Sequence, residues 1–412
     1  MSSATPQAIA VSKALEAVLR QDRGRLMAAL TYRLHSFQLA EDALQEASIS
    51  ALVHWGREGL PHSPQGWLIR VAFRKALDQL RADGRSTERD TAMHLVNELL
   101  GEDEPETIPD ERLRLIFTCC HPALELKSRV ALTLRTVCGL STADITRLFL
   151  DTEPTMGQRL SRAKAKIASI GAAYAAPEPD EWDERLQAVL TTVYLIFTTG
   201  YTASSADTAR DLCDEALFLA RLLLALRPDQ PEVEGALALM LLTDARRAAR
   251  IGPSGATVPP AEQDRSLWDS SKMAEGRELL EAALARKRAG PFQVKAAIGA
   301  CQMPDAPGAA VDWLQILQLY TVLLTMEPTP VVRVNLAVAL AETGNLAAAQ
   351  AMLAGQRAEL SEFQPFHAAQ AAVFAKAGDK AAAERAYSAA IALASNDSDR
   401  VFLEAKIRQL SL

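Results

Sequence analysis

Five polar side chains in one short stretch have the types and the spacing needed to read duplex DNA. They are Thr155, Gln158, Arg159, Arg162 and Lys166. In a helix they would fall on one side, because the backbone turns by about 100° per residue. Glutamine and arginine near a helix start can bond base edges in the major groove, and the later cations are better placed for phosphates. A solvated basic face on a structural helix is the alternative interpretation.

The elements that must position these side chains are two helices separated by a tight break, over residues 141–167. Ser141 and Asp144 have capping-box spacing, which predicts a first helix ending near Leu150. Pro154 suits the first turn of the second helix, where its missing N–H would have no intrahelical partner. Four residues at helical spacing are predicted to face a core: Met156, Leu160, Ala163 and Ile167. The pattern predicts a helix-turn-helix.

A second basic helix is predicted over residues 64–81, with Ser63 before its start. One stripe is apolar and is formed by Ile69, Phe73, Ala76 and Leu80. The neighbouring side is basic overall and carries an indole; its residues are Trp67, Arg70, Arg74, Asp78 and Arg81. Cations beside a flat aromatic ring suit a strand of unstacked DNA, because phosphates are neutralised while bases stack. The alternative interpretation is that Trp67 is a core residue.

Upstream, residues 40–55 are predicted to form a helix with an acidic side. Asp42, Gln45 and Glu46 group together on it. The opposite side is apolar and consists of Leu44, Ala47, Ala51 and Leu52. A single acidic cluster of this kind is usually a solvated face.

The composition predicts an all-α protein of several domains. Of 412 residues 49% are apolar and only 5% aromatic, which favours helices over sheet. Residues 1–170 hold 22 basic and 21 acidic side chains and residues 171–412 hold 22 and 30, so the acidity lies in the second half. The predicted parts are a helical domain at 8–92, an acidic flexible linker at 93–109, a helix-turn-helix domain at 110–172, a linker at 173–182 and a helical extension at 183–412.

The cysteines indicate neither a metal site nor disulfides. The five lack C-x-x-C spacing, which fits a reducing compartment. A catalytic role for Cys119, Cys120 and His121 is the alternative to structural packing, but no orienting acid or glycine-rich loop is near them. No run of 18 apolar residues or signal peptide occurs. We therefore expect a cytoplasmic protein that is not an enzyme and has no cofactor.

The extension contains a repeat. Residues 341–353 and 375–387 superpose Gly344 on Gly378 and Leu353 on Tyr387, with an offset of 34 residues, the tetratricopeptide (TPR) period. Small residues allow paired helices to approach closely, and glycine allows the turn between them to reverse. This predicts a TPR-like α-solenoid, clearest over residues 310–395. An irregular helical bundle is the alternative, because alanine-rich helices produce chance periodicity.

Taken together, these elements resemble a bacterial sigma factor of the extracytoplasmic-function (ECF) class. The resemblance covers residues 8–172: AEDALQEASISAL resembles sigma region 2.2, RVAFRKALDQLR region 2.4, and residues 110–140 with the helix-turn-helix region 4. The motifs RLRLIFTCCHPAL and QDRSLWD, with the TPR-like tail, resemble the subgroup that carries a long C-terminal extension. Nothing resembles regions 1.1 or 3.

The resemblance implies partners and residue roles. Core RNA polymerase, through its β′ clamp coiled coil and β flap, and promoter DNA are the implied partners, and the extension is expected to bind a protein or peptide. The implied contacts are Asp42, Gln45 and Glu46 with the clamp, Trp67, Arg70, Arg74 and Lys75 with the −10 element, and Thr155, Gln158, Arg159, Arg162 and Lys166 with the −35 element.

Two positions depart from the family pattern, and one competing function remains. Ser48 stands where region 2.2 often has an aromatic residue, and Lys75 where region 2.4 often has asparagine. These departures leave the strength of docking and the −10 sequence open. The competing function is a helix-turn-helix regulator that binds promoters without polymerase and senses a ligand through its TPR-like domain. Whether the extension inhibits or supports activity is also left open.

Overall fold

The computed structural model describes residues 6–82, 111–149, 151–170, 177, 180–202, 206–303, 310–394 and 396–410. Within these residues the regular elements are helices, and the β-pairing is an isolated bridge between Ile251 and Thr257. The all-α prediction is therefore confirmed for this part of the chain. The chain divides into two compact units, residues 1–195 and 196–412, and the boundary falls inside α9 (Trp182–Thr202).

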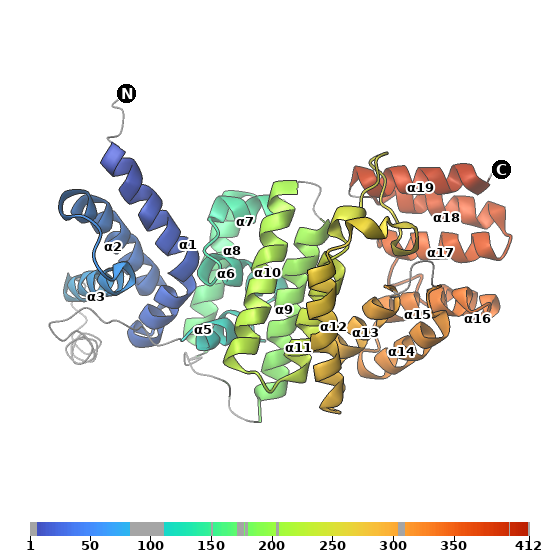
Figure 1. Ribbon diagram of the computed structural model, residues 1–412, viewed down its shortest axis with the longest axis horizontal. Helices are drawn as coiled ribbons and strands as arrows, with labels where there is room; N and C mark the ends of the chain where they lie inside the picture. The colour runs from blue at the N-terminus through green and yellow to red at the C-terminus, as the bar shows by residue number, and fades with distance from the viewer. Residues whose placement is uncertain are drawn as a thin grey trace. The chain divides into compact units, whose positions relative to one another are not determined.

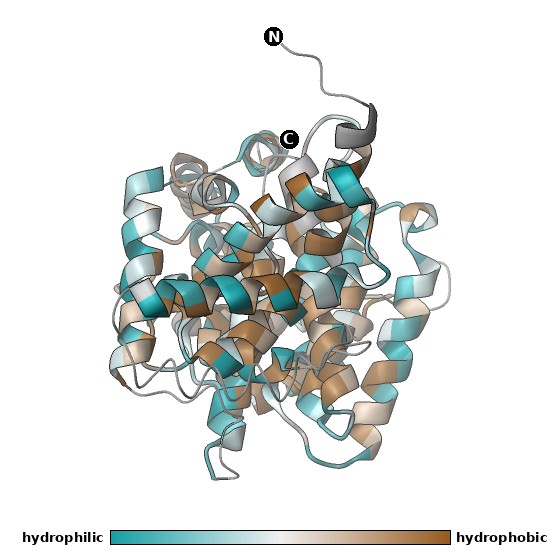
Figure 2. Ribbon diagram, turned by 90° about the vertical axis from the view of Figure 1, so that its left-hand side faces the viewer, coloured by the Kyte–Doolittle hydropathy of each residue, from teal (hydrophilic) through white to brown (hydrophobic). Residues whose placement is uncertain are grey.

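The first unit opens with three packed helices, α1 (Pro6–Leu34), α2 (Phe37–Glu58) and α3 (Pro64–Ala82) (Figure 1). Helices in Figure 2 carry hydrophobic and hydrophilic residues along their length, as expected where one face of a helix is buried. The core between these three holds Leu26, Leu30, Leu44, Trp55 and Leu68, none more than 1% exposed. The apolar stripe predicted for residues 64–81 is also buried: Ile69, Phe73, Ala76 and Leu80.

Four further helices form the helix-turn-helix part of the first unit: α5 (Arg112–Cys119), α6 (Leu126–Thr136), α7 (Thr142–Phe149) and α8 (Glu153–Ser169). The predicted capping box is confirmed, because the Asp144 N–H donates to Ser141 Oγ at 3.0 Å and the Ser141 N–H donates to Asp144 Oδ2 at 3.3 Å. Thr152 caps α8 by accepting from the Thr155 N–H. Leu150 lies outside the described residues.

The predicted linker at 93–109 also lies outside the described residues, as does most of 173–182. The first half of α9 packs on the helix-turn-helix part. The Trp182 and Phe117 rings are 5.0 Å apart, and Arg185 Nη2 donates to the Phe117 carbonyl at 3.0 Å. Residues 182–195 therefore belong to the first unit, while the domain boundaries drawn from the sequence stay a prediction.

The second unit begins with α10 (Ala206–Leu226), α11 (Pro231–Asp244), α12 (Ser270–Ala285) and α13 (Pro291–Cys301). Three short 3₁₀ helices join α11 to α12: η1 (Arg247–Ala249), η2 (Pro260–Glu262) and η3 (Arg265–Leu267). Helix α11 is buried almost all round, because α10, α12 and α13 all pack on it. Gly235 permits this, since a Cβ there would lie 2.7 Å from the Gln293 backbone nitrogen.

Six helices complete the second unit: α14 (Trp313–Met326), α15 (Pro330–Glu342), α16 (Leu346–Ala354), α17 (Gln364–Lys376), α18 (Lys380–Ala392) and α19 (Asp397–Leu410). Residues 34 positions apart have matching environments. Gly344 and Gly378 have φ of 90° and 79°, Asn345 and Asp379 each cap the following helix, and Leu353 and Tyr387 are both buried. The sequence offset is therefore also a structural offset over α15–α18.

The turn glycine at 344 supports a first testable prediction. Gly344→Ala is expected to lower the free energy of unfolding by about 1 kcal/mol, because a Cβ disfavours a left-handed φ of 90°. A Cβ there meets nothing within 4 Å, so the effect is conformational rather than steric. Gly355→Ala is the matched control, since Gly355 has a helical φ of −66°. Urea unfolding of both variants measures the difference, and equal effects would contradict the explanation.

Candidate nucleic-acid interface

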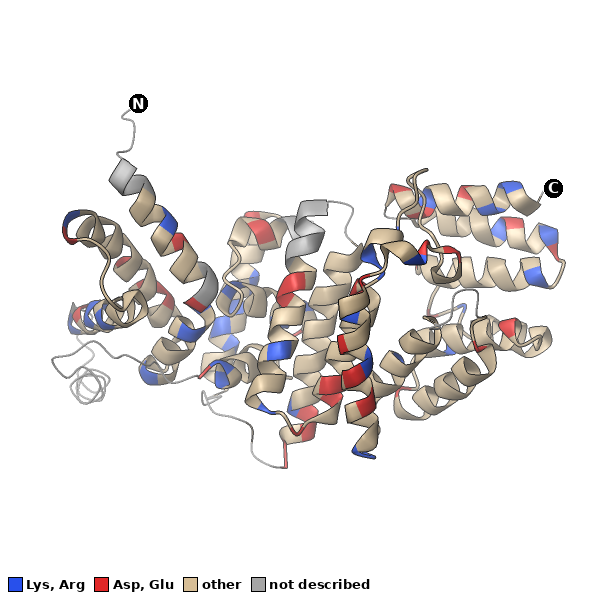
Figure 3. Ribbon diagram, in the orientation of Figure 1, with Lys and Arg blue, Asp and Glu red and all other residues tan. Residues whose placement is uncertain are grey.

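Helix α8 presents most of the predicted DNA-reading residues to solvent. Met156, Leu160, Ala163 and Ile167 are buried, as the sequence predicts, and they anchor one side of the helix. Gln158, Arg162 and Lys166 are exposed. Thr155 is exposed too, and its hydroxyl lies 2.9 Å from that of Thr152, the cap of α8. Figure 3 shows Lys and Arg along α8.

Arg159 is held differently from its neighbours. It lies within 3.5 Å of both Glu125 and Asp151, and its side chain is only 23% exposed. The two carboxylates tie the start of α8 to the α7–α8 turn and to α6. Arg159 can therefore position the helix, whereas Gln158 and Arg162 are the better placed to reach a groove.

Trp67 on α3 belongs to a small aromatic cluster with two residues of α2, which the sequence did not predict. Its ring stacks on His54 at 5.4 Å and meets the edge of Trp55 at 5.5 Å. Trp55 is fully buried, whereas Trp67 is half-buried, so one part of its ring is anchored and another part stays accessible. On the same helix Arg74 is exposed and Arg70 is half-buried.

The acidic side of α2 lies beside this helix. Gln45 and Glu46 are exposed, and Asp42 accepts from the Gln38 amide at 2.9 Å. Lys75 Nζ lies 3.8 Å from Glu46 Oε2, so two residues predicted to contact different partners contact each other. Ser48, one of the two departures from the family pattern, donates to the Leu44 carbonyl of its own helix at 2.7 Å.

Helix α2 also carries an exposed apolar patch, and this corrects the sequence analysis. Leu52 was expected on the buried side with Leu44, Ala47 and Ala51, but it is 46% exposed. Leu52 is one position further round the helix than Ala51, beyond the reach of α1 and α3. Together with Ile49 at 51% and Val53 at 53% it forms an apolar strip next to Gln45 and Glu46. The spacing of 49, 52 and 53, three and four residues apart, was the signal that could have revealed it.

Glu41 gathers three cations from three other helices. Its Oε2 lies 2.5 Å from Lys164 Nζ on α8, and its Oε1 lies 2.8 Å from Arg135 Nη2 on α6 and 3.5 Å from Arg23 Nη2 on α1. Burial by itself would raise the pKa of Glu41, but Lys164, Arg135 and Arg23 outweigh it and hold the pKa below its ordinary value. On a helical wheel Lys164 falls about 180° from Thr155, so α8 presents opposite sides to Glu41 and to solvent.

The Glu41 contacts lead to a second prediction. Glu41→Gln is expected to lower the free energy of unfolding by about 2 kcal/mol at neutral pH, because three partly buried cations lose their counter-charge. Since the folded-state pKa is depressed, the stabilisation is full above the ordinary value of 4.5 and is lost as the pH falls through the lower folded-state value. Denaturant unfolding across that range measures it.

The adjacent carboxylate provides the control for that measurement. Asp42 makes a single side-chain bond to Gln38, so Asp42→Asn should change stability by less than about 0.5 kcal/mol. A Glu41→Gln effect no larger than that of Asp42→Asn, or one that stays constant into acid, would contradict the assignment.

The cysteine pair is structural. Cys119 and Cys120 are at most 1% exposed, and burial raises the pKa of both thiols, so neither is a ready nucleophile. His121 Nδ1 accepts from the Ala123 N–H at 3.1 Å and thereby shapes a turn. Among the residues the structure describes, no group of His, Cys, Asp or Glu could hold a metal ion.

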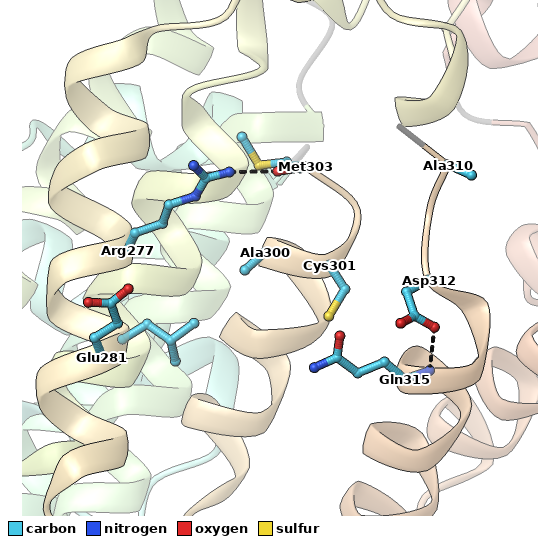
Figure 4. Close-up of a pocket in the computed structure, with 9 residues that line it drawn as sticks. Arg277, Glu281, Ala300, Cys301, Met303, Ala310, Asp312 and Gln315 are labelled. Atoms are coloured by element: carbon cyan, nitrogen blue, oxygen red, sulfur yellow. Dashed lines mark hydrogen bonds between the residues drawn. The ribbon is translucent and has the colours of Figure 1, made fainter. Parts of the chain in front are cut away.

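The second unit contains a cavity of about 440 Å³ bordered by α12, α13 and the start of α14 (Figure 4). Arg277 projects toward it but donates to the Met303 carbonyl at 2.6 Å, and Asp312 caps α14 by accepting from the Gln315 N–H at 2.9 Å. Burial raises the pKa of Cys301, which keeps that thiol protonated. Arg277 and Asp312 thus both make hydrogen bonds to the backbone beside the cavity.

Comparisons with known proteins agree with this arrangement. Sigma-70 region 2 matches residues 18–86, sigma-70 region 4 matches residues 114–167, and a family of unknown function, DUF6596, matches residues 185–284. The uncharacterized protein R00370 of Rhizobium meliloti (strain 1021) is 36% identical over 405 residues, which cover 96% of each chain. No solved structure matches the chain.

The two sigma matches fall on the helices that carry the predicted contacts. Region 2 spans α2 and α3 with most of α1, and region 4 spans most of α5 and α6 to α8. None of the helices in the described part of the chain is long and apolar enough to cross a membrane. The chain therefore carries sigma-70 region 2 and region 4 domains, which indicate a non-enzymatic sigma factor that binds core RNA polymerase and promoter DNA to direct transcription initiation.

Proposed function

We propose that this chain is an alternative sigma factor of the ECF class. Its C-terminal extension regulates transcription or serves as a docking site for another protein. The observation that carries the proposal is the exposed row Gln158, Arg162 and Lys166 on α8, a helix anchored by its opposite apolar side in a region 4 domain. Two DNA readers on one chain suit a bipartite promoter, because tethering raises the effective concentration of the second contact.

The −35 element is read by α8 in this proposal. Gln158 and Arg162 bond base edges in the major groove, and Thr155 and Lys166 contact phosphates. Arg159 positions the helix through its ion pairs with Glu125 and Asp151. It contacts DNA only when those ion pairs break. The predicted base-reading set thereby narrows to two side chains.

The −10 element is engaged by α3. Trp67 offers the accessible part of its ring to an unstacked base, while Arg70, Arg74 and Lys75 neutralise nearby phosphates. His54 and Trp55 support the ring from α2, so it needs little reordering when a base arrives. Lys75 is available for DNA when Glu46 turns to the polymerase, because the 3.8 Å pair between them is exposed and weak.

Core polymerase docks on α2. Asp42, Gln45 and Glu46 supply the polar contacts, and Ile49, Leu52 and Val53 supply the apolar centre. An exposed apolar strip beside polar groups is the usual composition of a protein interface, with the buried apolar part contributing most of the affinity.

The extension is proposed to be a TPR-like solenoid that binds a protein or peptide. The proposal is supported by the matching environments of residues 34 positions apart in α15–α18. The last residues of the equivalent helices α15 and α17, Glu342 and Lys376, also form an ion pair at 2.6 Å. The repeat is clearest over residues 310–395.

Run-off transcription with purified core enzyme tests the proposal. The full chain is expected to bind core polymerase and to direct a transcript from its own promoter, and a failure of both would overturn the proposal. Tight, promoter-specific binding of duplex DNA without polymerase would instead favour a stand-alone regulator. Comparing transcription by the full chain with transcription by residues 1–202, which retain α9 whole, shows whether the extension inhibits or supports activity. A more active fragment means that the extension inhibits transcription, and a less active fragment means that the extension is required.

A further inference from the structure

A cationic cluster in the second unit lies where the chain leaves α11 and enters η1. It contains Arg246, Arg247 and Arg250, together with Lys272 near the start of α12. It faces Tyr201, near the end of α9: Arg250 Nη1 donates to the Tyr201 carbonyl, and the Arg250 guanidinium lies 4.9 Å from the centre of the Tyr201 ring. All of these residues lie within the DUF6596 match, to which no function is attached.

Asp244 binds two of the cations in this cluster, Arg247 and Lys272. It is 3% exposed, its Oδ1 accepts from Arg247 Nε at 2.5 Å, and its Oδ2 lies 2.6 Å from Lys272 Nζ. Arg247 and Lys272 therefore have a buried counter-charge. Among the described residues, the hydrogen bonds and ion pairs of Asp244 go to Arg247 and Lys272 and not to Arg246 or Arg250.

Arg246 is buried with its charge uncompensated. The residue is 7% exposed, and two of its nitrogens, Nε and Nη1, are buried without a hydrogen-bond partner. In the part of the chain that the structure describes, no other side chain has two such atoms. Burial lowers the pKa of Arg246, and the titratable neighbour that opposes this effect is Tyr201 rather than a carboxylate. A folded protein rarely keeps a buried guanidinium unpaired, because the lost hydration is very unfavourable.

We propose that Arg246, Arg250 and the Tyr201 hydroxyl form a binding site for a small oxyanion, the phosphate or carboxylate group of a low-molecular-weight ligand. A guanidinium offers parallel N–H donors that match two oxygens of such a group, and the unpartnered Nε and Nη1 of Arg246 are donors of this kind. Arg246 and Arg250 lie at the two ends of the single 3₁₀ turn η1, and Arg250 contacts both the ring and the carbonyl of Tyr201. Tyr201 and Arg250 are half-buried, which gives an anion a way in from solvent.

Neighbouring structure makes the site rigid. The Tyr201 ring stacks on Phe197 at 5.8 Å, and the Asp269 N–H donates to the Ala245 carbonyl at 2.9 Å, which joins the start of α12 to the end of α11. The η1 and η3 segments also pack on each other, so the QDRSLWD motif supports the loop that carries Arg246. The site thus gives a role to the QDRSLWD motif, which polymerase and DNA binding leave unused.

Thermal unfolding of the purified full-length protein tests the site with sodium phosphate and sodium acetate as probes, each compared with sodium chloride at equal ionic strength. A saturable rise in the unfolding midpoint is expected with at least one probe. A rise with phosphate alone assigns a phosphate ligand, and a rise with acetate alone assigns a carboxylate. Equal midpoints in all three salts would overturn the proposal. The assay contains neither polymerase nor DNA, so it can fail independently of the proposed function.

Arg246→Met separates this site from general anion effects. The variant should lose the anion-dependent rise, and in chloride it should unfold at the same temperature as the wild type or higher, because an apolar side chain replaces an unpaired buried charge. Arg357→Met, at an exposed arginine of the same unit, should behave as wild type. If Arg246→Met does not fold, Tyr201→Phe replaces it and should weaken binding about tenfold. An undiminished rise in the variant that folds would overturn the assignment.

Discussion

The double variant Gln158→Ala with Arg162→Ala is expected to lower promoter-directed transcription about 100-fold while leaving folding intact. Each base contact contributes about 1–3 kcal/mol, and two such losses together give an effect of this size. Both side chains are exposed and point away from the core formed by Met156, Leu160, Ala163 and Ile167. Stability should therefore change by less than about 0.5 kcal/mol.

Run-off assays on the natural promoter and on promoters with altered −35 bases measure this effect. The wild type should discriminate between the promoters, and the double variant should transcribe them at similar low levels. Lys13→Ala is the control, because Lys13 is an exposed cation of the same unit that lies on α1, outside both sigma-70 matches. A uniform loss that keeps the preference between promoters would mean that α8 contacts phosphates only. Unchanged transcription would contradict the assignment of α8 to the −35 element.

Leu52→Asp is expected to weaken binding to core polymerase by at least about 30-fold, with a matching loss of transcription. A charge in the apolar centre of a protein interface must be desolvated without a partner, and central positions of this kind typically contribute about 2 kcal/mol or more. Because Leu52 is 46% exposed in the free chain, the variant should fold normally. Pull-down or fluorescence titration with purified core enzyme gives the affinity directly.

The matched control for this variant is Leu284→Asp on α12. Leu284 is 47% exposed, so the two substitutions place the same charge at equally accessible leucines in different units. Leu284→Asp should bind core polymerase as the wild type does. If both variants lose affinity equally, the loss is nonspecific. If neither does, polymerase does not dock on the apolar strip of α2.

The parts of the fold that sequence analysis predicted correctly are those governed by local rules. The capping box of Ser141 and Asp144, the cap at Thr152 and the buried side of α8 each depend on residues within a few turns of one helix. The turns at Gly344 and Gly378 are local too, since a positive φ favours glycine wherever it occurs. Such features are encoded by spacing and residue type, so they are readable before any tertiary contact is known.

The incorrect or missing parts depend on which helix packs where. Leu52 has the residue type of a core position but lies just beyond the reach of its neighbours, and periodicity alone does not define the edge of a buried face. The ion pairs of Arg159 with Glu125 and Asp151 could not be read from spacing either, and the role of Arg159 at DNA stays a prediction. The half-buried position of Trp67 results from its contacts with Trp55 and His54 on another helix, which the sequence of its own helix does not reveal.

The sequence by itself determined two basic helices, an acidic extension and a 34-residue repeat in a chain whose described residues are helical, because helical periodicity, caps and charge are local or additive properties. Only the tertiary structure decided that Glu41 would meet Lys164, 123 positions away, and that Arg246 would be buried without a carboxylate. Burial and pairing between distant residues depend on the packing of whole helices. The pairing of Glu41 and the isolation of Arg246 therefore appear only once the chain has folded.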